Sequence, residues 1–213
     1  MCRPLDWIPE VPHPLGGGEA VIPDALLYYQ RRTANRNDDA PRRDDVNRAD
    51  SADGNDGNDG NDGNDGNDGN GNDARGGVML RACVEADRAT MGPERLAAKL
   101  GAYARLHSYA PAPAVRQRQQ PLPEPVQETW RQRYPLFPRI LFVLDDTGPA
   151  GIATRIHALC TAARDVSLAG FLREVPVLAA SMTDLLQHGP TAPIWRPVHD
   201  PDHRVDWTHT RHP

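Results

Sequence analysis

The chain has 213 residues, which is enough for one domain with a real hydrophobic core. Its formal net charge of −5 is unevenly spread, because residues 53–73 hold seven Asp and no Lys or Arg, which leaves the rest of the chain at +2. This near-neutral, Arg-rich remainder permits contacts with phosphate groups but does not demand them. With no apolar run of transmembrane length and no signal peptide at the first residues, we expect a cytoplasmic protein without membrane association.

The cysteines give no signal for a disulfide framework or a metal site. Cys2, Cys83 and Cys160 are odd in number, far apart and in no CxxC pair. Cys83 and Cys160 lie in apolar periodic stretches, so we interpret them as small core residues. The pattern suits a reducing compartment.

The first predicted elements are short. Residues 7–11 favour a short strand or the stub of a helix, because four prolines between residues 4 and 14 argue against a long element. Residues 20–29 predict a strand that contains Pro23, which places it at a sheet edge, at a bulge or at the start of a strand. Asp24 follows this proline directly.

Residues 30–76 predict a long disordered insert. Asn-Asp-Gly repeats five times in register from residue 55 to residue 69, and the repeat offers no side chain to bury. A calcium-binding β-roll needs a longer repeat with a regular inward-facing apolar residue, which this tract lacks. We therefore interpret the tract as an expanded loop between two strands, where a long insertion costs the fold little.

The central predicted element is a strand at residues 78–87, followed by a helix. The strand ends in Glu85 and Asp87, which point to the same side because side chains alternate along a strand. Pro93 fits the first turn of the helix, and Lys99 lies beside its apolar stripe. The stripe comprises Leu96, Leu100, Tyr103 and Ala104.

Strands and helices alternate through the rest of the chain. After a Pro-rich linker or flap at 110–126, the pattern predicts a strand at 137–145, a helix at 152–163, a strand at 175–180, a short helix at 183–189 and an edge strand at 194–198. This order predicts an α/β fold, with a mixed central sheet flanked by helices on both faces. We expect one domain over residues 1–198, interrupted by the insert, and a flexible polar tail at 199–213.

Three acids and a lysine fall where metal-dependent phosphodiester hydrolysis needs them. Asp24, Glu85 and Asp87 are the candidate Mg²⁺ ligands, since Mg²⁺ prefers oxygen and keeps several of its waters. Lys99 is the candidate catalytic cation, which would orient the nucleophile or stabilise charge on the phosphate. These four residues form the predicted catalytic site.

A structural role for the same residues remains an alternative. Glu85 and Asp87 would then pair with nearby cations as an ion network, and Asp24 would close a turn. The cations in reach are Arg81, Arg88 and Lys99. A separate metal site at the C-terminus is also conceivable from His199, His203, His209 and His212 with Asp200 and Asp202, although the proline-interrupted context favours adventitious binding there.

The candidate site residues also carry a family resemblance. The strings concerned are Pro23-Asp24-Ala25-Leu26-Leu27, Val84-Glu85-Ala86-Asp87-Arg88-Ala89-Thr90-Met91 and Arg95-Leu96-Ala97-Ala98-Lys99-Leu100-x-x-Tyr103. They resemble the core of the plasmid replication-relaxation family of actinobacterial proteins. That core in turn resembles the restriction-endonuclease-like PD-(D/E)xK fold.

The resemblance implies a nuclease-like protein that acts on plasmid DNA by Mg²⁺-dependent hydrolysis if it is active. The fold usually places a lysine two residues after the second acid, where this chain has Asp87, so Lys99 would supply the cation from the helix. Glu10 would be the further acid found near the start of such cores. A winged-helix domain usually precedes this core, which implies a truncated member here. The alternative is a catalytically inactive DNA-associated or protein-interaction module.

Overall fold

The computed structural model describes residues 3–32, 77–111, 127–145 and 148–209. The chain divides into two units, one made of residues 1–31 and 79–213 and the other of residues 32–78. Nearly all of the predicted disordered insert and most of the predicted linker at 110–126 lie outside the described residues. The elements that bear on function belong to the larger unit.

Six strands form the main sheet of the larger unit. They are β1 (Arg3–Pro9), β4 (Ala25–Arg32), β5 (Gly77–Asp87), β6 (Arg139–Leu144), β7 (Val177–Ser181) and β8 (Arg196–Pro197). Their order is β1-β4-β5-β6-β7-β8. β5, β6 and β7 run parallel, whereas β1 is antiparallel to β4 and β8 is antiparallel to β7. The predicted α/β fold with a mixed sheet is therefore confirmed.

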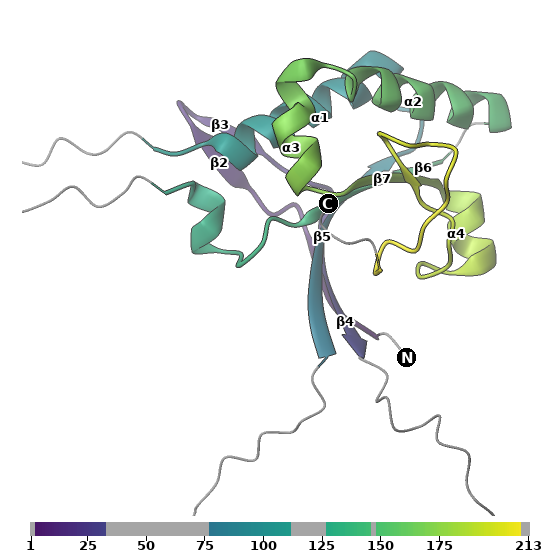
Figure 1. Ribbon diagram of the computed structural model, residues 1–213, viewed down its shortest axis with the longest axis horizontal. Helices are drawn as coiled ribbons and strands as arrows, with labels where there is room; N and C mark the ends of the chain where they lie inside the picture. Colours follow the sequence, from purple (N-terminus) through teal and green to yellow (C-terminus); the bar gives the residue numbers. More distant parts are fainter. Residues whose placement is uncertain (1–2, 33–76, 112–126, 146–147, 210–213) are drawn as a thin grey trace, which may run out of the picture. The chain divides into compact units, whose positions relative to one another are not determined.

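Helices cover both faces of this sheet. They are α1 (Pro93–Ser108), α2 (Pro149–Ala162), α3 (Ala169–Glu174) and α4 (Met182–His188), with 3₁₀ turns η1 (Thr129–Gln132) and η2 (Val166–Leu168). α1, α2 and α3 pack on one face and α4 packs on the other (Figure 1). Within the described ranges, no helix combines the length and the apolar character needed to cross a lipid bilayer.

Local sequence signals set the ends of these helices. α1 begins after Gly92, which is extended, and Pro93 occupies the first turn, where a missing N–H costs nothing. α4 is capped by Ser181, whose hydroxyl accepts a hydrogen bond of 3.0 Å from the backbone N–H of Asp184. It ends at Gly189, whose φ of 83° suits a residue without a Cβ.

Alternation along the parallel strands produces two cores. Ile140, Phe142 and Leu144 of β6 lie in the core under α1, α2 and α3, while Leu141 and Val143 lie in the core on the α4 side. On β5, the residues in register with Ile140, Phe142 and Leu144 are Cys83, Glu85 and Asp87. The two acids therefore lie on the face that α1 and α2 cover, as their spacing predicts.

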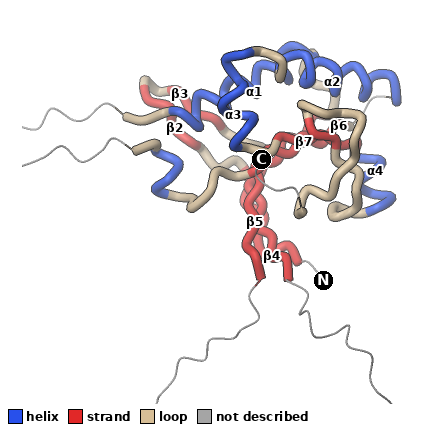
Figure 2. The backbone as a smooth tube through the Cα atoms, viewed as in Figure 1, coloured by secondary structure: helices blue, strands red, loops and turns tan. Residues whose placement is uncertain are grey.

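The predicted strand at 20–29 is interrupted and contributes to two sheets. Its first part is β3 (Glu19–Val21), which pairs with β2 (His13–Gly16) in a two-stranded ribbon packed against α1 (Figure 2). Its second part is β4. The break falls at Pro23, which has no N–H for a ladder hydrogen bond, and it leaves Asp24 in a turn directly before β4.

The stretch 199–209 differs from the expected flexible tail. Trp207 is fully buried and packs edge-to-face on Tyr29 of β4, with ring centroids 5.2 Å apart. The Nη1 atom of Arg31 donates a hydrogen bond of 2.8 Å to the carbonyl oxygen of Thr208. An indole in an otherwise polar segment is enough to anchor it, because a buried aromatic ring removes a large apolar area from water.

Candidate active site at the end of β5

The site is built on the last residues of β5. Glu85 and Asp87 are both buried, with exposed fractions of 1% and 0%. Carboxylates at such depth need partners, because burial of an unpaired charge is costly. The two acids find theirs on different helices, Glu85 on α1 and Asp87 on α2.

Glu85 is held by two side chains of α1. The Nζ atom of Lys99 forms an ion pair with Oε2, and the hydroxyl of Tyr103 donates a hydrogen bond of 2.5 Å to Oε1. Lys99 and Tyr103 are four residues apart, so they lie on one face of the helix. Burial raises the pKa of Glu85, the contacts with Lys99 and Tyr103 counter this rise, and the charge of Asp24 reinforces it.

Asp24 is brought to the same end of β5 by a backbone contact. Its Oδ2 atom accepts a hydrogen bond of 2.7 Å from the backbone N–H of Ala86, the residue after Glu85. The side chain of Asp24 is itself exposed. The backbone N–H of Glu10 donates to the carbonyl oxygen of Asp24 at 3.2 Å, which ties the start of the domain to this turn.

Asp87 belongs to a separate, sealed cluster. Its Oδ2 atom accepts a hydrogen bond of 2.7 Å from Nε of Arg155, and Nη2 of Arg155 also donates to the carbonyl oxygen of Met91 at 3.2 Å. The buried Oδ1 atom of Asp87 has no hydrogen-bond partner in the described part of the chain. Arg155 therefore neutralises Asp87 and fixes the turn between β5 and α1.

A pocket of about 380 Å³ opens onto the Glu85 cluster. Glu85, Lys99 and Tyr103 line it from β5 and α1, and residues of the β2–β3 ribbon form the opposite wall. Glu19 and Arg105 also line the pocket. A ligand in this pocket would meet Lys99 and Glu85, whereas neither Asp24 nor Asp87 is part of the lining.

The structure thus brings together three of the four predicted site residues. Asp24, Glu85 and Lys99 lie at one end of β5, and Asp87 is directed to Arg155 instead. Among the described residues there is no group of three or more His, Cys, Asp or Glu side chains arranged to hold a metal ion. The donors available to Mg²⁺ are therefore the two carboxylates of Asp24 and Glu85.

Two carboxylates are a sufficient donor set for Mg²⁺ when a substrate phosphate and water complete its shell. Burial is the largest cause of the raised pKa of Glu85 and the charge of Asp24 is the smallest, and Lys99 is already the counter-ion of Glu85. The residues present fit a Mg²⁺ ion held by Asp24 and Glu85 by the chemistry of this donor set.

The sequence did not predict that Arg155 and Tyr103 contact the two acids of β5. Arg155 was not among the candidate site residues, yet it is buried against Asp87. Tyr103 was assigned to the core alone, although its place four residues after Lys99 signals a shared partner. The spacing could have identified Tyr103, while the partner of Asp87 depends on how α2 packs.

The histidines and acids near the C-terminus, where the sequence favours adventitious binding, divide into separate pairs. His203 contacts Asp200 at 2.7 Å and His209 contacts Asp206 at 2.6 Å. Both histidines are exposed, and His212 lies outside the described residues.

Comparison with family models, with curated proteins and with solved structures finds no match to this chain.

Proposed function

We propose that this protein is a nuclease-like member of the replication-relaxation type, which hydrolyses phosphodiester bonds of plasmid DNA with Mg²⁺. The observation that carries the proposal is the convergence of Asp24, Glu85 and Lys99 at one end of β5, beside a pocket of about 380 Å³. An acidic pair with a neighbouring lysine is the residue set that this chemistry requires.

The order of the elements supports a restriction-endonuclease-like core. Asp24 stands directly before β4, and Glu85 stands near the end of β5, the neighbour of β4 in the sheet. The next helix is α1, and the strand after it, β6, runs parallel to β5. Lys99 reaches Glu85 from α1, which supports the idea that the helix supplies the cation that Asp87 cannot.

The chain's own residues then have distinct roles. Asp24 and Glu85 would hold the metal, which when bound supplies charge neutralisation and an activated water. Lys99 would bind a non-bridging phosphate oxygen and stabilise the charge that develops on it. Tyr103 would orient the Glu85 carboxylate, and Asp87 with Arg155 would fix the end of β5 without touching the substrate.

A second function is favoured by one observation. Both oxygens of Glu85 already have partners in Lys99 and Tyr103, as expected of a structural ion network. On this hypothesis the protein is a catalytically inactive DNA-associated or protein-interaction module. The two functions differ in whether Asp24 and Glu85 are needed for turnover.

The test is a nicking assay on supercoiled plasmid, with the full chain and with Mg²⁺ added or chelated. We expect Mg²⁺-dependent nicking that falls by about a hundredfold or more in Asp24→Asn, Glu85→Gln and Lys99→Met, because each removes a group that acts on the transition state. Glu94→Gln, an exposed acid on the same helix as Lys99, is the matched control and should retain full activity.

Two outcomes contradict the enzyme proposal. Nicking that persists unchanged in Asp24→Asn and Glu85→Gln would identify a contaminating nuclease. A folded wild-type chain that binds plasmid without nicking it would favour the inactive module.

A further inference from the structure

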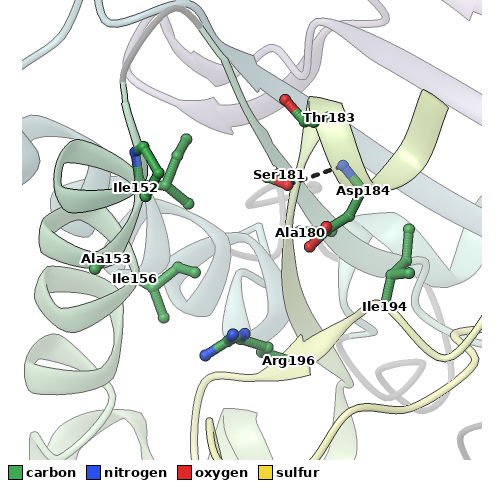
Figure 3. Close-up of a pocket in the computed structure, with 10 residues that line it drawn as sticks. Ile152, Ala153, Ile156, Ala180, Ser181, Thr183, Asp184, Ile194 and Arg196 are labelled. Atoms are coloured by element: carbon green, nitrogen blue, oxygen red, sulfur yellow. Dashed lines mark hydrogen bonds between the residues drawn. The ribbon is translucent and has the colours of Figure 1, made fainter. Parts of the chain in front are cut away.

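A second pocket, of about 310 Å³, lies at the carboxyl end of β7 and beside α2 (Figure 3). It shares no lining residue with the pocket at Glu85. Its walls come from α2, from the end of β7, from the first turn of α4 and from the segment that enters β8. The proposed nuclease site does not use any of these residues.

The position of this pocket favours ligand binding. β6 leads into α2 on one face of the sheet, and β7 leads into α4 on the other face (Figure 1). In open α/β sheets, neighbouring strands whose connections diverge in this way leave a crevice outside their carboxyl ends, where ligands bind. The pocket lies in this crevice, between α2 and α4.

The pocket offers one cation without a counter-ion. Arg196 is half-buried at its wall, and in the described part of the chain no carboxylate or other acceptor pairs with its guanidinium. Asp184 also lines the pocket, but Arg204 contacts its carboxylate at 3.4 Å and compensates its charge. Arg196 is therefore the group of this pocket that is suited to an anion, since a guanidinium matches phosphate geometry.

The remaining lining supplies an apolar wall and two polar groups. Ile152 and Ile156 of α2 and Ile194 form aliphatic surfaces around the space that Arg196 enters (Figure 3). The Oγ atom of Ser181 accepts from the backbone of Asp184, which leaves its O–H as a donor. A ligand that satisfies this lining carries an anionic group, an apolar ring system and an N–H donor for the Asp184 carboxylate.

We propose that this pocket is a binding site for a nucleoside monophosphate. Arg196 holds the phosphate, the isoleucines of α2 cover a face of the base, and Ser181 and Asp184 contact the polar edge of the base, where Asp184 accepts from an exocyclic amine. The volume of about 310 Å³ is at the small end of ligand pockets and suits one mononucleotide. The proposal is independent of nuclease activity.

The test follows the amide chemical shifts of the ¹⁵N-labelled full chain during titration with AMP, adenosine and inorganic phosphate. AMP should give saturable shifts at Ile152, Ser181 and Arg196. Arg196→Met should weaken AMP binding by about tenfold or more, because a charge-assisted bidentate contact is lost. Arg173→Met, at an exposed arginine of α3, is the matched control and should bind like wild type.

A second variant distinguishes loss of AMP binding from loss of the fold. Ala153 lies on the pocket wall but is exposed, so Ala153→Phe should fill the pocket while leaving the far-UV circular dichroism unchanged. AMP binding should then be abolished. No saturable shift at millimolar AMP, equal binding by Arg196→Met, or shifts confined to the Glu85 pocket would each overturn the proposal.

Discussion

Glu85 and Asp87 stand two residues apart on one face of β5, yet their surroundings differ in kind. Glu85 meets Lys99, whose side chain is 27% exposed and lines an open pocket. Asp87 meets Arg155, whose side chain is 10% exposed and is closed over by α2. Two carboxylates on the same face of one strand therefore have different roles, one beside a ligand pocket and one structural.

The difference shows that the covering helix, rather than the strand, decides what a buried acid can do. α1 presents an ammonium and a phenol at the wall of a pocket, where a ligand can compete for the carboxylate. α2 presents a guanidinium that also holds the carbonyl of Met91, which leaves Asp87 no freedom to exchange partners. We therefore expect changes at Asp87 to affect stability most, and changes at Glu85 to affect titration and function most.

The largest effect should come from Arg155→Met. It leaves the Asp87 carboxylate buried and unpaired, so the free energy of unfolding should fall by about 3–5 kcal/mol, as for other broken buried pairs. Urea denaturation at neutral pH measures it. The double variant Asp87→Leu with Arg155→Met should recover most of the loss. A loss below about 1 kcal/mol in the single variant would show that water reaches Asp87 and would remove the contrast with Glu85.

Tyr103→Phe should have an intermediate effect. It removes the hydroxyl that donates to Glu85 while keeping the ring in the core. A hydrogen bond to a charged group contributes about 2 kcal/mol, so we expect a loss of that order in urea denaturation. If stability is unchanged, Lys99 alone is enough to hold Glu85.

Lys99→Met should reduce stability little but shift a titration. Because Lys99 is about a quarter exposed, the loss in unfolding free energy should be about 1 kcal/mol or less. The pKa of Glu85 should rise further, since the contact with Lys99 is the main effect that opposes burial. Carboxyl ¹³C shifts measured against pH report this pKa, and an unchanged value would show that the ion pair does not form in solution.

The smallest effect concerns the pH dependence of stability. Because the folded-state pKa of Glu85 is raised, its contribution to stability is complete below the ordinary Glu pKa of about 4.3 and is lost as pH rises through the folded value. The advantage of wild type over Glu85→Gln should therefore shrink as pH rises over this interval. Denaturation at several pH values in metal-free buffer tests it, with Glu94→Gln as control. An advantage that grows with pH would contradict the raised pKa.

Much of the fold could be predicted because the relevant signals are local. The strand at 78–87 and the helix that follows agree closely with β5 and α1, since apolar alternation and Pro93 act within a few residues. The strand at 20–29 was predicted in one piece because the pattern left open whether Pro23 lies at an edge, at a bulge or at the start of a strand. α3 was missed because it is only six residues long.

The sequence predicts which residues lie at the candidate site, but not which side chains each of them contacts. Two-residue spacing places Glu85 and Asp87 on one face, and the contact from Asp24 to Ala86 follows from neighbouring strands. The pairing of Asp87 with Arg155 joins residues that are 68 positions apart, through the packing of α2. Periodicity along one helix cannot reveal a contact of that kind.

The most direct test of the central claim asks where a divalent ion binds. Mn²⁺ added to the ¹⁵N-labelled full chain broadens the amide signals of residues near the ion. If Asp24 and Glu85 are the ligands, broadening should centre on Ala86 and the turn before β4, and Asp24→Asn should abolish it. Broadening centred on Met91 and Arg155, or only on the histidines between residues 199 and 209, would contradict the assignment of Glu85 as the functional acid of β5.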